Sequence, residues 1–358
     1  MKRTVILIAG VALLSGSCAK KETGLSEKEL VGKAIFFDES LSEPAGQSCA
    51  TCHTPEKGFA DKYARITSEG AMKGLFSNRI SMTCAYSAYV PALSYDEEEE
   101  TYVGGLFWDG RVNSLEEQAA QPFVNPLEMG NENVGDVVRK ARSAYWYPDF
   151  VRIYGEHASA DTVFTYINEV IALYERSAEM NPFSSKFDAW QAGKCQLTEE
   201  EKLGYELFKE KGLCAECHIL DPDERAGKVL FTDHTYDNLG IPSNPGNPFF
   251  KVSAPYNTCG KDTMDLGLGS RLRDPEEYGK FRVPTLRNIA LTAPYGHNGY
   301  FKTLEEIVHF YNVRDVEDFP PAEYPETVNK DELGNLGLSQ EEETAIVAFL
   351  RILTDCIK

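Results

Sequence analysis

The chain has 358 residues, of which 42% are apolar and 26% charged, so it has the composition of a globular protein of about two domains. Acidic residues outnumber basic ones by 56 to 36, which gives a formal net charge of −20. This charge argues against nucleic-acid binding, which needs a basic surface, and favours a cationic partner. Nine cysteines beside six histidines are unusual, and an odd number cannot all pair within one chain.

The first residues are typical of an export signal. A basic start is followed by an apolar run from Thr4 to Leu14 and then by three small residues. The run is shorter than the roughly 20 apolar residues of a membrane span. Cys18, directly after the small residues, resembles the lipidated cysteine of a bacterial lipoprotein, and plain secretion is the alternative. We expect a signal peptide at 1–17, a tether at 18–29, and a periplasmic location with membrane contact only through a lipid anchor.

Two segments of the chain are similar to each other. Leu30–Phe37 leads to Cys49-Ala-Thr-Cys-His53, and Lys202–Phe208 leads to Cys214-Ala-Glu-Cys-His218. Each copy has a glycine-containing amphipathic segment that ends in aromatic residues, then a loop, then a C-x-x-C-H motif. An internal repeat of this kind predicts two related domains.

The rest of the chain is predicted to be helical with long loops. Apolar residues recur at helical spacing in five stretches, at 115–121, 134–144, 163–176, 304–311 and 339–354. Thr198, followed by three glutamates, is typical of a helix N-terminus. Alternating strand patterns are few and short, and Leu239–Pro255 is predicted to be a loop. The acidic run Asp96–Glu100 is interpreted as a solvated loop tip.

The C-x-x-C-H motif is the attachment signature of c-type haem, in which two thiols bind the porphyrin and the histidine binds the iron. The alternatives are a zinc site, which needs no histidine directly after the cysteines, and a redox dithiol, which is expected in a βαβ context. Two copies in matching context favour haem. The predicted attachment residues are Cys49, Cys52, Cys214 and Cys217, and the predicted iron ligands are His53 and His218.

Further stretches make the chain resemble the bacterial di-haem cytochrome c peroxidase family. They are Phe107–Arg111, Ser114–Ala119, Asn125–Met129, Phe281–Asn288, Leu291–Gly299 and Thr303–Glu306. With the two haem motifs, the resemblance extends from Leu30 to Asn312. It implies a mainly α fold of two cytochrome c-like haem domains with long loops. The peroxidatic domain is expected at 30–185 and the electron-transfer domain at 195–358.

The resemblance also assigns roles in the first domain. Trp108 matches a tryptophan that lies between the haems and carries electrons, and Gln118 and Glu128 match the pair above the first haem. A carboxylate there can move a proton between the peroxide oxygens while an amide holds the peroxide. Many classical members also have an inhibitory histidine after the first motif. Because no histidine lies between His53 and His157, the first haem is expected to be open without prior reduction.

The second haem is where members of the family differ. Classical members have a methionine ligand at the position that falls here on Tyr311, 17 residues after Pro294. A tyrosine resembles the MauG branch of the family, and a phenolate ligand is expected to lower the reduction potential. The alternative is that Tyr311 is only an aromatic residue of a helix.

Family members hold a calcium ion between the domains, so one calcium ion is expected here. Thr292 and Pro294 match its carbonyl donors, and Asn78 matches the asparagine donor only if its loop is shifted. Calcium accepts oxygen ligands in flexible geometry, which allows such a shift.

Three functions follow from these patterns. The first is a peroxidase that reduces hydrogen peroxide with electrons from a small exported donor such as a cytochrome c. The second is a MauG-type oxidase that acts on side chains of a partner protein, and the third is a non-catalytic electron-transfer cytochrome. A homodimer is expected because dimers are common in the family. Four cysteines remain, which allows two disulfides in any of three pairings, or free thiols: Cys84, Cys195, Cys259 and Cys356.

Overall fold

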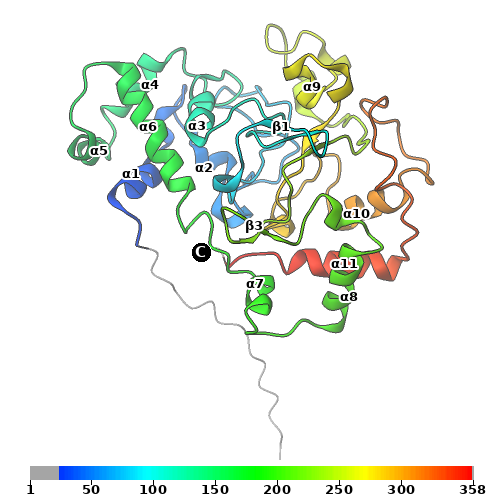
Figure 1. The fold of residues 1–358 in the computed structure, drawn as a ribbon. Coiled ribbons are helices and arrows are strands. Elements are labelled where there is room, and N and C mark those ends of the chain that lie inside the picture. The colour runs from blue at the N-terminus through cyan, green and yellow to red at the C-terminus, as the bar shows by residue number, and fades with distance from the viewer. Residues whose placement is uncertain (1–23, 357–358) are drawn as a thin grey trace, which may run out of the picture.

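The structure is a computed structural model, and it describes residues 24–356. Eleven α-helices and three short two-stranded antiparallel sheets make up the regular structure of this range, with long loops between them (Figure 1). The predicted mainly α fold is therefore confirmed. The predicted signal peptide at 1–17, Cys18 and the first part of the tether lie outside the described residues.

The helices fall into two consecutive groups. The first group is α1 (Glu27–Phe36), α2 (Cys49–Cys52), α3 (Leu115–Val124), α4 (Val134–Ala141), α5 (Tyr147–Tyr154) and α6 (Ala160–Glu175). The second group is α7 (Lys186–Gln191), α8 (Glu199–Lys209), α9 (Gly267–Leu272), α10 (Leu304–Val313) and α11 (Gln340–Arg351). The strand pairs are β1 (Ser94–Asp96) with β2 (Thr101–Val103), β3 (Pro222–Asp223) with β4 (Lys228–Val229), and β5 (Tyr236–Asp237) with β6 (Phe281–Arg282).

All five helices predicted from apolar spacing are present, as α3, α4, α6, α10 and α11. Each begins after a residue whose side chain accepts a hydrogen bond from the first turn, as Ser114 does for α3 and Thr303 for α10. Thr198 and Glu201 form the predicted start of α8 as a reciprocal capping box. Outside the haem motifs, three short helices were not predicted: α5, α7 and α9. α5 has proline in its first turn, α7 lies in a serine-rich stretch, and α9 contains two glycines.

In each half, the helix before the haem motif crosses the last helix in direct contact. A Cβ atom on Gly32 of α1 would clash with the carbonyl group of Val170 in α6, and a Cβ atom on Gly204 of α8 would clash with that of Ala345 in α11. Figure 1 shows both crossings, α1 with α6 and α8 with α11. Glycine is required at each crossing because only a residue without a side chain lets the two backbones approach this closely. The sequence repeat is thus also a structural repeat.

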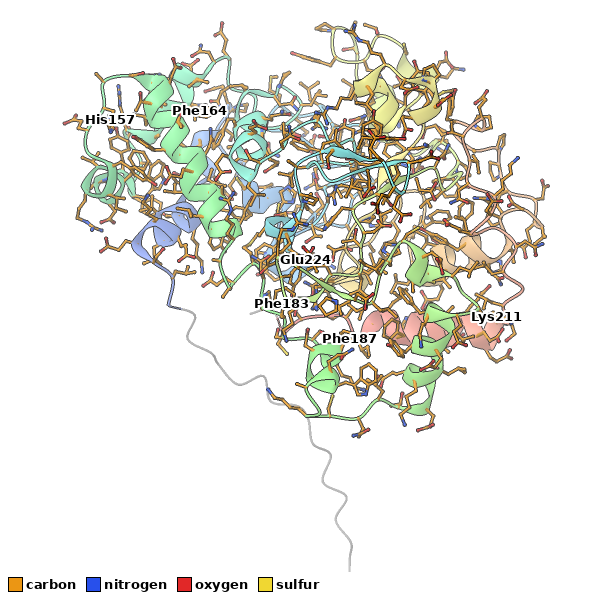
Figure 2. All side chains as sticks on the ribbon, viewed as in Figure 1. His157, Phe164, Phe183, Phe187, Lys211 and Glu224 are labelled. Carbon is orange, nitrogen blue, oxygen red and sulfur yellow. The ribbon has the colours of Figure 1, made fainter. Side chains whose placement is uncertain are left out.

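Each half has its own apolar core, and a polar seam joins them. In the seam, the buried Arg287 guanidinium forms a two-point ion pair with Asp188, with both distances at 3.0 Å, and lies over the ring of Phe183. Tyr86 of the first half donates to Asp355 of the second at 2.5 Å. Phe183 and Phe187 mark the place where the chain passes from one half to the other (Figure 2).

Two loop predictions are also confirmed. The acidic run Asp96–Glu100 forms the turn of the β1–β2 hairpin, and its glutamates are exposed. Leu239–Pro255 is a loop that contains one 3-10 turn, at Pro248–Lys251. Within residues 24–356 there is no helix with the length and apolarity that a membrane crossing requires.

Two candidate haem sites

The first C-x-x-C-H motif folds as one helical turn followed by an extended histidine. Cys49 and Cys52 begin and end α2, and His53 is its C-terminal cap. Nδ1 of His53 lies 3.1 Å from the carbonyl oxygen of Phe59, a residue in the left-handed region at φ 60°. Burial lowers the pKa of His53, so the ring is neutral. When Nδ1 donates to the carbonyl, the lone pair of Nε2 is left for a metal ligand bond.

The second motif orients its histidine in the same way, although Cys214–Glu216 form a 3-10 turn where the first motif has an α-helical one. Nδ1 of His218 lies 2.8 Å from the carbonyl oxygen of Phe231, which is also left-handed, at φ 56°. Burial lowers the pKa of His218 to about 4. The structure therefore repeats both the cysteine spacing and the hydrogen bond that orients each histidine.

Each motif lines a cavity of its own. The first cavity has a volume of about 210 Å³ and brings Cys49, Cys52 and His53 together with Gln118 and Glu128. The sequence-predicted residues of the first site are thus close together, although they come from separate parts of the chain.

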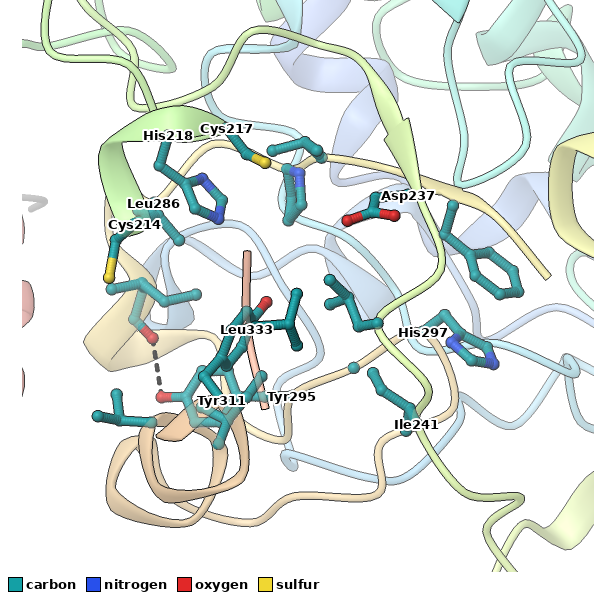
Figure 3. A pocket seen from close by; sticks show the side chains of 18 of the residues that line it. Cys214, Cys217, His218, Asp237, Ile241, Leu286, Tyr295, His297, Tyr311 and Leu333 are labelled. Carbon is teal, nitrogen blue, oxygen red and sulfur yellow. Dashed lines mark hydrogen bonds between the residues drawn. The ribbon is translucent and has the colours of Figure 1, made fainter. Parts of the chain in front are cut away.

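The second cavity has a volume of about 200 Å³ and brings Cys214, Cys217 and His218 together with Tyr311. Figure 3 shows His218 and Tyr311 on opposite sides of this cavity. The predicted residues of the second site are therefore also brought together.

The residues of the two cavities fit a c-type haem in each. The four motif cysteines are free thiols, as haem attachment requires. Arg282 is 6% exposed, lines both cavities, and donates from Nε to the carbonyl oxygen of Phe107 at 3.3 Å. Burial lowers its pKa and no carboxylate offsets that effect. A buried cation of this kind needs a counter-charge, and the haem propionates would supply one.

Glu128 is held in the first cavity by its backbone. Its N–H donates to the carbonyl oxygen of Asn125 at 3.0 Å, and its own carbonyl accepts from Ala71 at 2.6 Å. Burial raises the pKa of the Glu128 carboxyl, which Arg111 and Asn125 oppose. A carboxyl with a raised pKa is suited to accept and return a proton near neutral pH.

Trp108 belongs to the walls of both cavities. Its indole N–H donates to the carbonyl oxygen of Ile80 at 3.2 Å, and its carbonyl accepts from the N–H of Arg282 at 2.9 Å. Its ring meets Phe281 edge to face at a centroid distance of 6.5 Å. These contacts fix the indole in the wall that the cavities share.

Tyr311 lies on α10, whose start is fixed by a capping box between Thr303 and Glu306. Tyr311 lies on the face of this helix that lines the second cavity. Its neighbours Phe310 and Asn312 point in other directions around the helix and are buried. Burial raises the pKa of its phenol. A phenol at this place can reach the side of the cavity opposite His218 (Figure 3).

The three predicted calcium donors do not line one cavity. Thr292 and Pro294 line the second haem cavity. Asn78 donates to Asp265 at 3.2 Å and lines a small separate cavity with Asp265 and Glu323. Calcium binding at these three residues stays a prediction.

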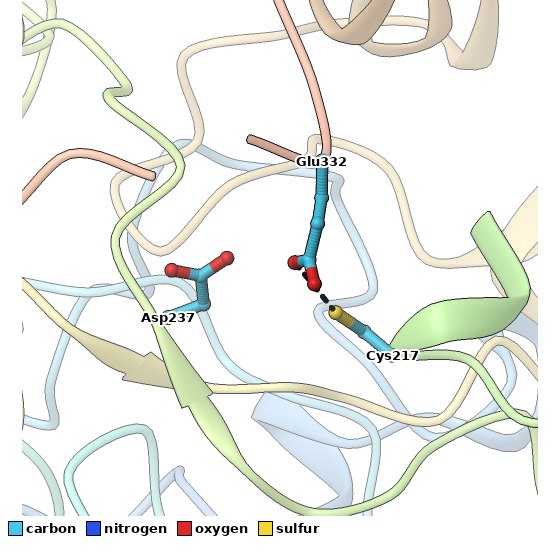
Figure 4. Close-up of side chains that lie close together, drawn as sticks. All are labelled: Cys217, Asp237 and Glu332. Atoms are coloured by element: carbon cyan, nitrogen blue, oxygen red, sulfur yellow. Dashed lines mark hydrogen bonds between the residues drawn. The ribbon is translucent and has the colours of Figure 1, made fainter. Parts of the chain in front are cut away.

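Two acidic residues of the second site were missed by sequence reasoning. Asp237 and Glu332 have oxygen atoms within 4.8 Å of each other and of the Cys217 sulfur (Figure 4). The Glu332 carboxylate lies 3.9 Å from that sulfur. Because Cys217 belongs to a haem motif and all three residues line the second cavity, we assign the cluster to the edge of that cavity and not to a separate metal ion. The two acids are far apart in sequence, and neither lies in a motif.

Four cysteines lie after Cys18 and outside the haem motifs. Three of them are free thiols: Cys84, Cys195 and Cys259. None of the three pairings among the four remaining cysteines is therefore formed.

The chain was compared with known proteins. A family model described as di-haem cytochrome c peroxidase matches residues 26–196. The methylamine utilization protein MauG of Paracoccus denitrificans is 35% identical over 347 residues, which cover 91% of this chain and 88% of that protein. The chain belongs to the di-haem cytochrome c peroxidase family. Another member, the cytochrome-c peroxidase IdrP1 of Denitromonas iodatirespirans, is 31% identical, with 92% of this chain and 82% of that protein covered.

A solved structure of the family has the same fold. The diheme peroxidase BthA of Burkholderia thailandensis superposes with a TM-score of 0.80 at 31% identity, over 92% of this chain and 86% of that one. The predicted family and the predicted fold of cytochrome c-like domains are thus confirmed. As a member of the di-haem cytochrome c peroxidase family, the chain is an oxidoreductase with two c-type haems.

Proposed function

We propose that this di-haem peroxidase reduces hydrogen peroxide to water in the first cavity, with electrons that a small cytochrome delivers through the second. The observation that carries the proposal is that Gln118 and Glu128 lie in the same cavity as His53, while Trp108 lines both cavities. The first cavity thus contains acid–base groups beside its iron ligand, and the second contains Tyr311.

The chain's own residues have separate roles in this reaction. When bound, the haem at each site would supply the redox-active iron. The Gln118 amide would hold the peroxide by hydrogen bonding, and Glu128 would take a proton from one peroxide oxygen and give it to the other, so that water can leave. The raised pKa of Glu128 supports this role, because a stronger base holds the proton long enough to pass it on.

Electron supply is assigned to the other half of the chain. We assign residues 30–185 to the peroxidatic domain and residues 195–358 to the electron-transfer domain, with Trp108 as the route between the cavities. The net charge of −20 supports a cationic donor, because long-range attraction speeds the encounter of oppositely charged proteins.

The remaining parts of the proposal rest on the sequence. The first residues support export to the periplasm and a lipid anchor at Cys18. The family resemblance supports a homodimer and one calcium ion at Asn78, Thr292 and Pro294. The amide nitrogen of Asn78 donates to Asp265, and the amide oxygen is the atom that would bind calcium.

The test begins with the absorption spectrum of the oxidised holoprotein. Hydrogen peroxide is then added without a reductant, and steady-state oxidation of reduced cytochrome c is measured. We expect a high-spin first haem that reacts with peroxide directly, and continuous cytochrome c oxidation. Two low-spin haems that do not react would instead identify an electron-transfer cytochrome.

A MauG-type protein oxidase is the second candidate. Tyr311 and the relative named methylamine utilization protein MauG favour it. The same experiment separates the two functions. Rapid reaction with peroxide and no steady-state oxidation of cytochrome c, or of another small donor, would support the oxidase and contradict the peroxidase.

A further inference from the structure

The repeat allows the walls of the two cavities to be compared position by position. The Thr83 hydroxyl donates to the carbonyl oxygen of Gly58 at 2.6 Å, and the Thr285 hydroxyl donates to that of Leu230 at 2.6 Å. Gly58 and Leu230 directly precede the two phenylalanines that orient the iron-ligand histidines. The two threonines are therefore equivalent. It follows that Cys84 in the first half is equivalent to Leu286 in the second.

The helix crossings give a second equivalence. Gly32 contacts Val170 as Gly204 contacts Ala345, so α6 and α11 align at these two residues. Five residues further along, Glu175 in α6 is equivalent to Leu350 in α11.

At both positions an apolar wall residue of the second cavity is replaced by a titratable one in the first. Leu286 and Leu350 line the second cavity, and Cys84 and Glu175 line the first. A phenylalanine carbonyl group orients the histidine in both cavities. The two cavities therefore differ in these wall residues and not in how the histidines are held.

Glu175 is in an unusual state for a carboxyl group. It is 3% exposed, and its Oε2 atom is buried without a hydrogen-bond partner. Burying a carboxyl group without a hydrogen-bond partner costs free energy of folding, because the group loses its hydration. A functional role would explain why such a group is present. Burial raises the pKa of Glu175 to about 8.

Few charged groups face Glu175 from the elements around it. Arg176 follows it in the chain and lowers its pKa, and Glu116 of α3 raises it. These two residues are paired with each other at 2.6 Å. Cys49 in α2, Cys84 and Tyr174 also lie near Glu175. Cys49 is a neutral thioether once haem is attached, and burial raises the pKa of Cys84 and of Tyr174, so both are neutral as well. No cation in the described part of the chain therefore forms an ion pair with Glu175.

We propose that Glu175 is a proton-holding group of the first cavity, which takes up a proton from solvent when an electron enters that cavity. The proposal rests on the proposed function only in assigning the first cavity to peroxide. Reduction of one hydrogen peroxide to two waters consumes two electrons and two protons. Each electron adds a negative charge to a buried site, where charge is expensive. A proton bound at Glu175 cancels that charge, and the leucine of the second cavity cannot do this.

The test measures the midpoint potential of each haem as a function of pH in the holoprotein, without peroxide. In the unaltered protein, the potential of the first haem is expected to fall as pH rises from neutral to alkaline, while that of the second changes less. In Glu175→Gln, which keeps the shape but cannot titrate, the fall of the first potential is expected to disappear. Equal pH dependence in the two proteins would overturn the proposal.

Two further variants sharpen the result. Glu169→Gln removes a carboxylate on the outer face of the same helix, where Glu169 pairs with Lys28 at 2.9 Å, and is expected to leave the pH dependence unchanged. Cys84→Leu copies the second cavity but keeps Glu175, and is also expected to retain it. Loss of the pH dependence in either variant would show that Glu175 is not its source.

An infrared difference spectrum between the oxidised and reduced proteins gives an independent readout. A carboxyl band from protonated Glu175 is expected in the unaltered protein and not in Glu175→Gln. Its presence in both would overturn the proposal. Both measurements are made without turnover, so a protein that shows the pH dependence but reduces no peroxide would contradict the proposed function and leave this inference intact.

Discussion

The two cavities share a frame and differ in their walls. In each, a C-x-x-C-H motif begins the site, and a left-handed phenylalanine orients the histidine. The first cavity then adds Glu128 and Glu175, whereas the second has Tyr311 and Leu350, with Asp237 and Glu332 at its edge. The comparison teaches that the repeated frame is suited to hold a cofactor, and that the few residues which differ decide what chemistry can occur there.

The two cavities also differ in the free energy of burying their side chains. The second cavity is closed mainly by aliphatic side chains, which are stable when buried, although burial also raises the pKa of Asp237 at its edge. The first cavity buries carboxyl groups whose pKa values are raised by that burial, so part of its stability is given up for groups that can exchange protons.

The largest effect is expected from removing the acid–base group of the first cavity. In Glu128→Gln, peroxide-dependent oxidation of reduced cytochrome c is expected to fall about 10²–10⁴-fold, because an amide cannot carry the proton between the peroxide oxygens. The haem spectra at rest are expected to be unchanged. Glu132→Gln is the control, since Glu132 is exposed and nearby in the chain. Turnover within twofold of the unaltered protein would remove Glu128 from the mechanism.

The next effect tests the shared frame. Gly32→Ala and Gly204→Ala each place a methyl group against the backbone of the crossing helix, and each is expected to lower the free energy of unfolding by about 3 kcal/mol. Thermal unfolding followed at the absorbance of both haems is expected to show earlier loss of the native absorbance of the haem in the altered half, which stays covalently attached.

Gly24→Ala is the control for this pair, because a Cβ atom there has no neighbour within 4 Å. If Gly32→Ala affected both haems equally, the halves would not unfold as separate cores.

The smallest effect on stability is expected at the second cavity. Tyr311→Phe removes one hydroxyl group, so the free energy of unfolding should change by about 1 kcal/mol or less. The low-spin spectrum and the potential of the second haem should nevertheless change, because the variant removes the phenolate that we propose as an iron ligand. Tyr256→Phe, at a residue that is 38% exposed, is the control. A second-haem spectrum unaffected by Tyr311→Phe would show that Tyr311 is only a helix aromatic.

Much of the fold and the principal site residues could be predicted from the sequence. The haem motifs are short and contiguous, so their function can be read from spacing alone, and the long helices have clear apolar periodicity and capping residues. The roles of Trp108, Gln118 and Glu128 came from a family resemblance, and the structure places them in the cavities where those roles can be carried out.

Other residues could not be predicted, because their environment depends on distant parts of the chain. Glu175 lies at the end of a helix and has no motif around it, and its burial follows from how α6 packs. Cys84 was considered only for a disulfide, although it lies in the wall of the first cavity. Asp237 and Glu332 come together only when the loops of the second half fold.

The helix crossings also set an order in which the two halves can be completed. Each core needs contact between the helix before its haem motif and its last helix. The last helix of the first half, α6, ends at Glu175, and the last helix of the second half, α11, ends at Arg351. Since synthesis begins at the N-terminus and domains fold as units, the first core can close while the second half is still being made. The second core cannot close until nearly the whole chain has emerged. The chain thus has a built-in assembly sequence, in which the core of the first half closes first and the cavity that contains Glu128 is completed when Arg282 of the second half joins its wall.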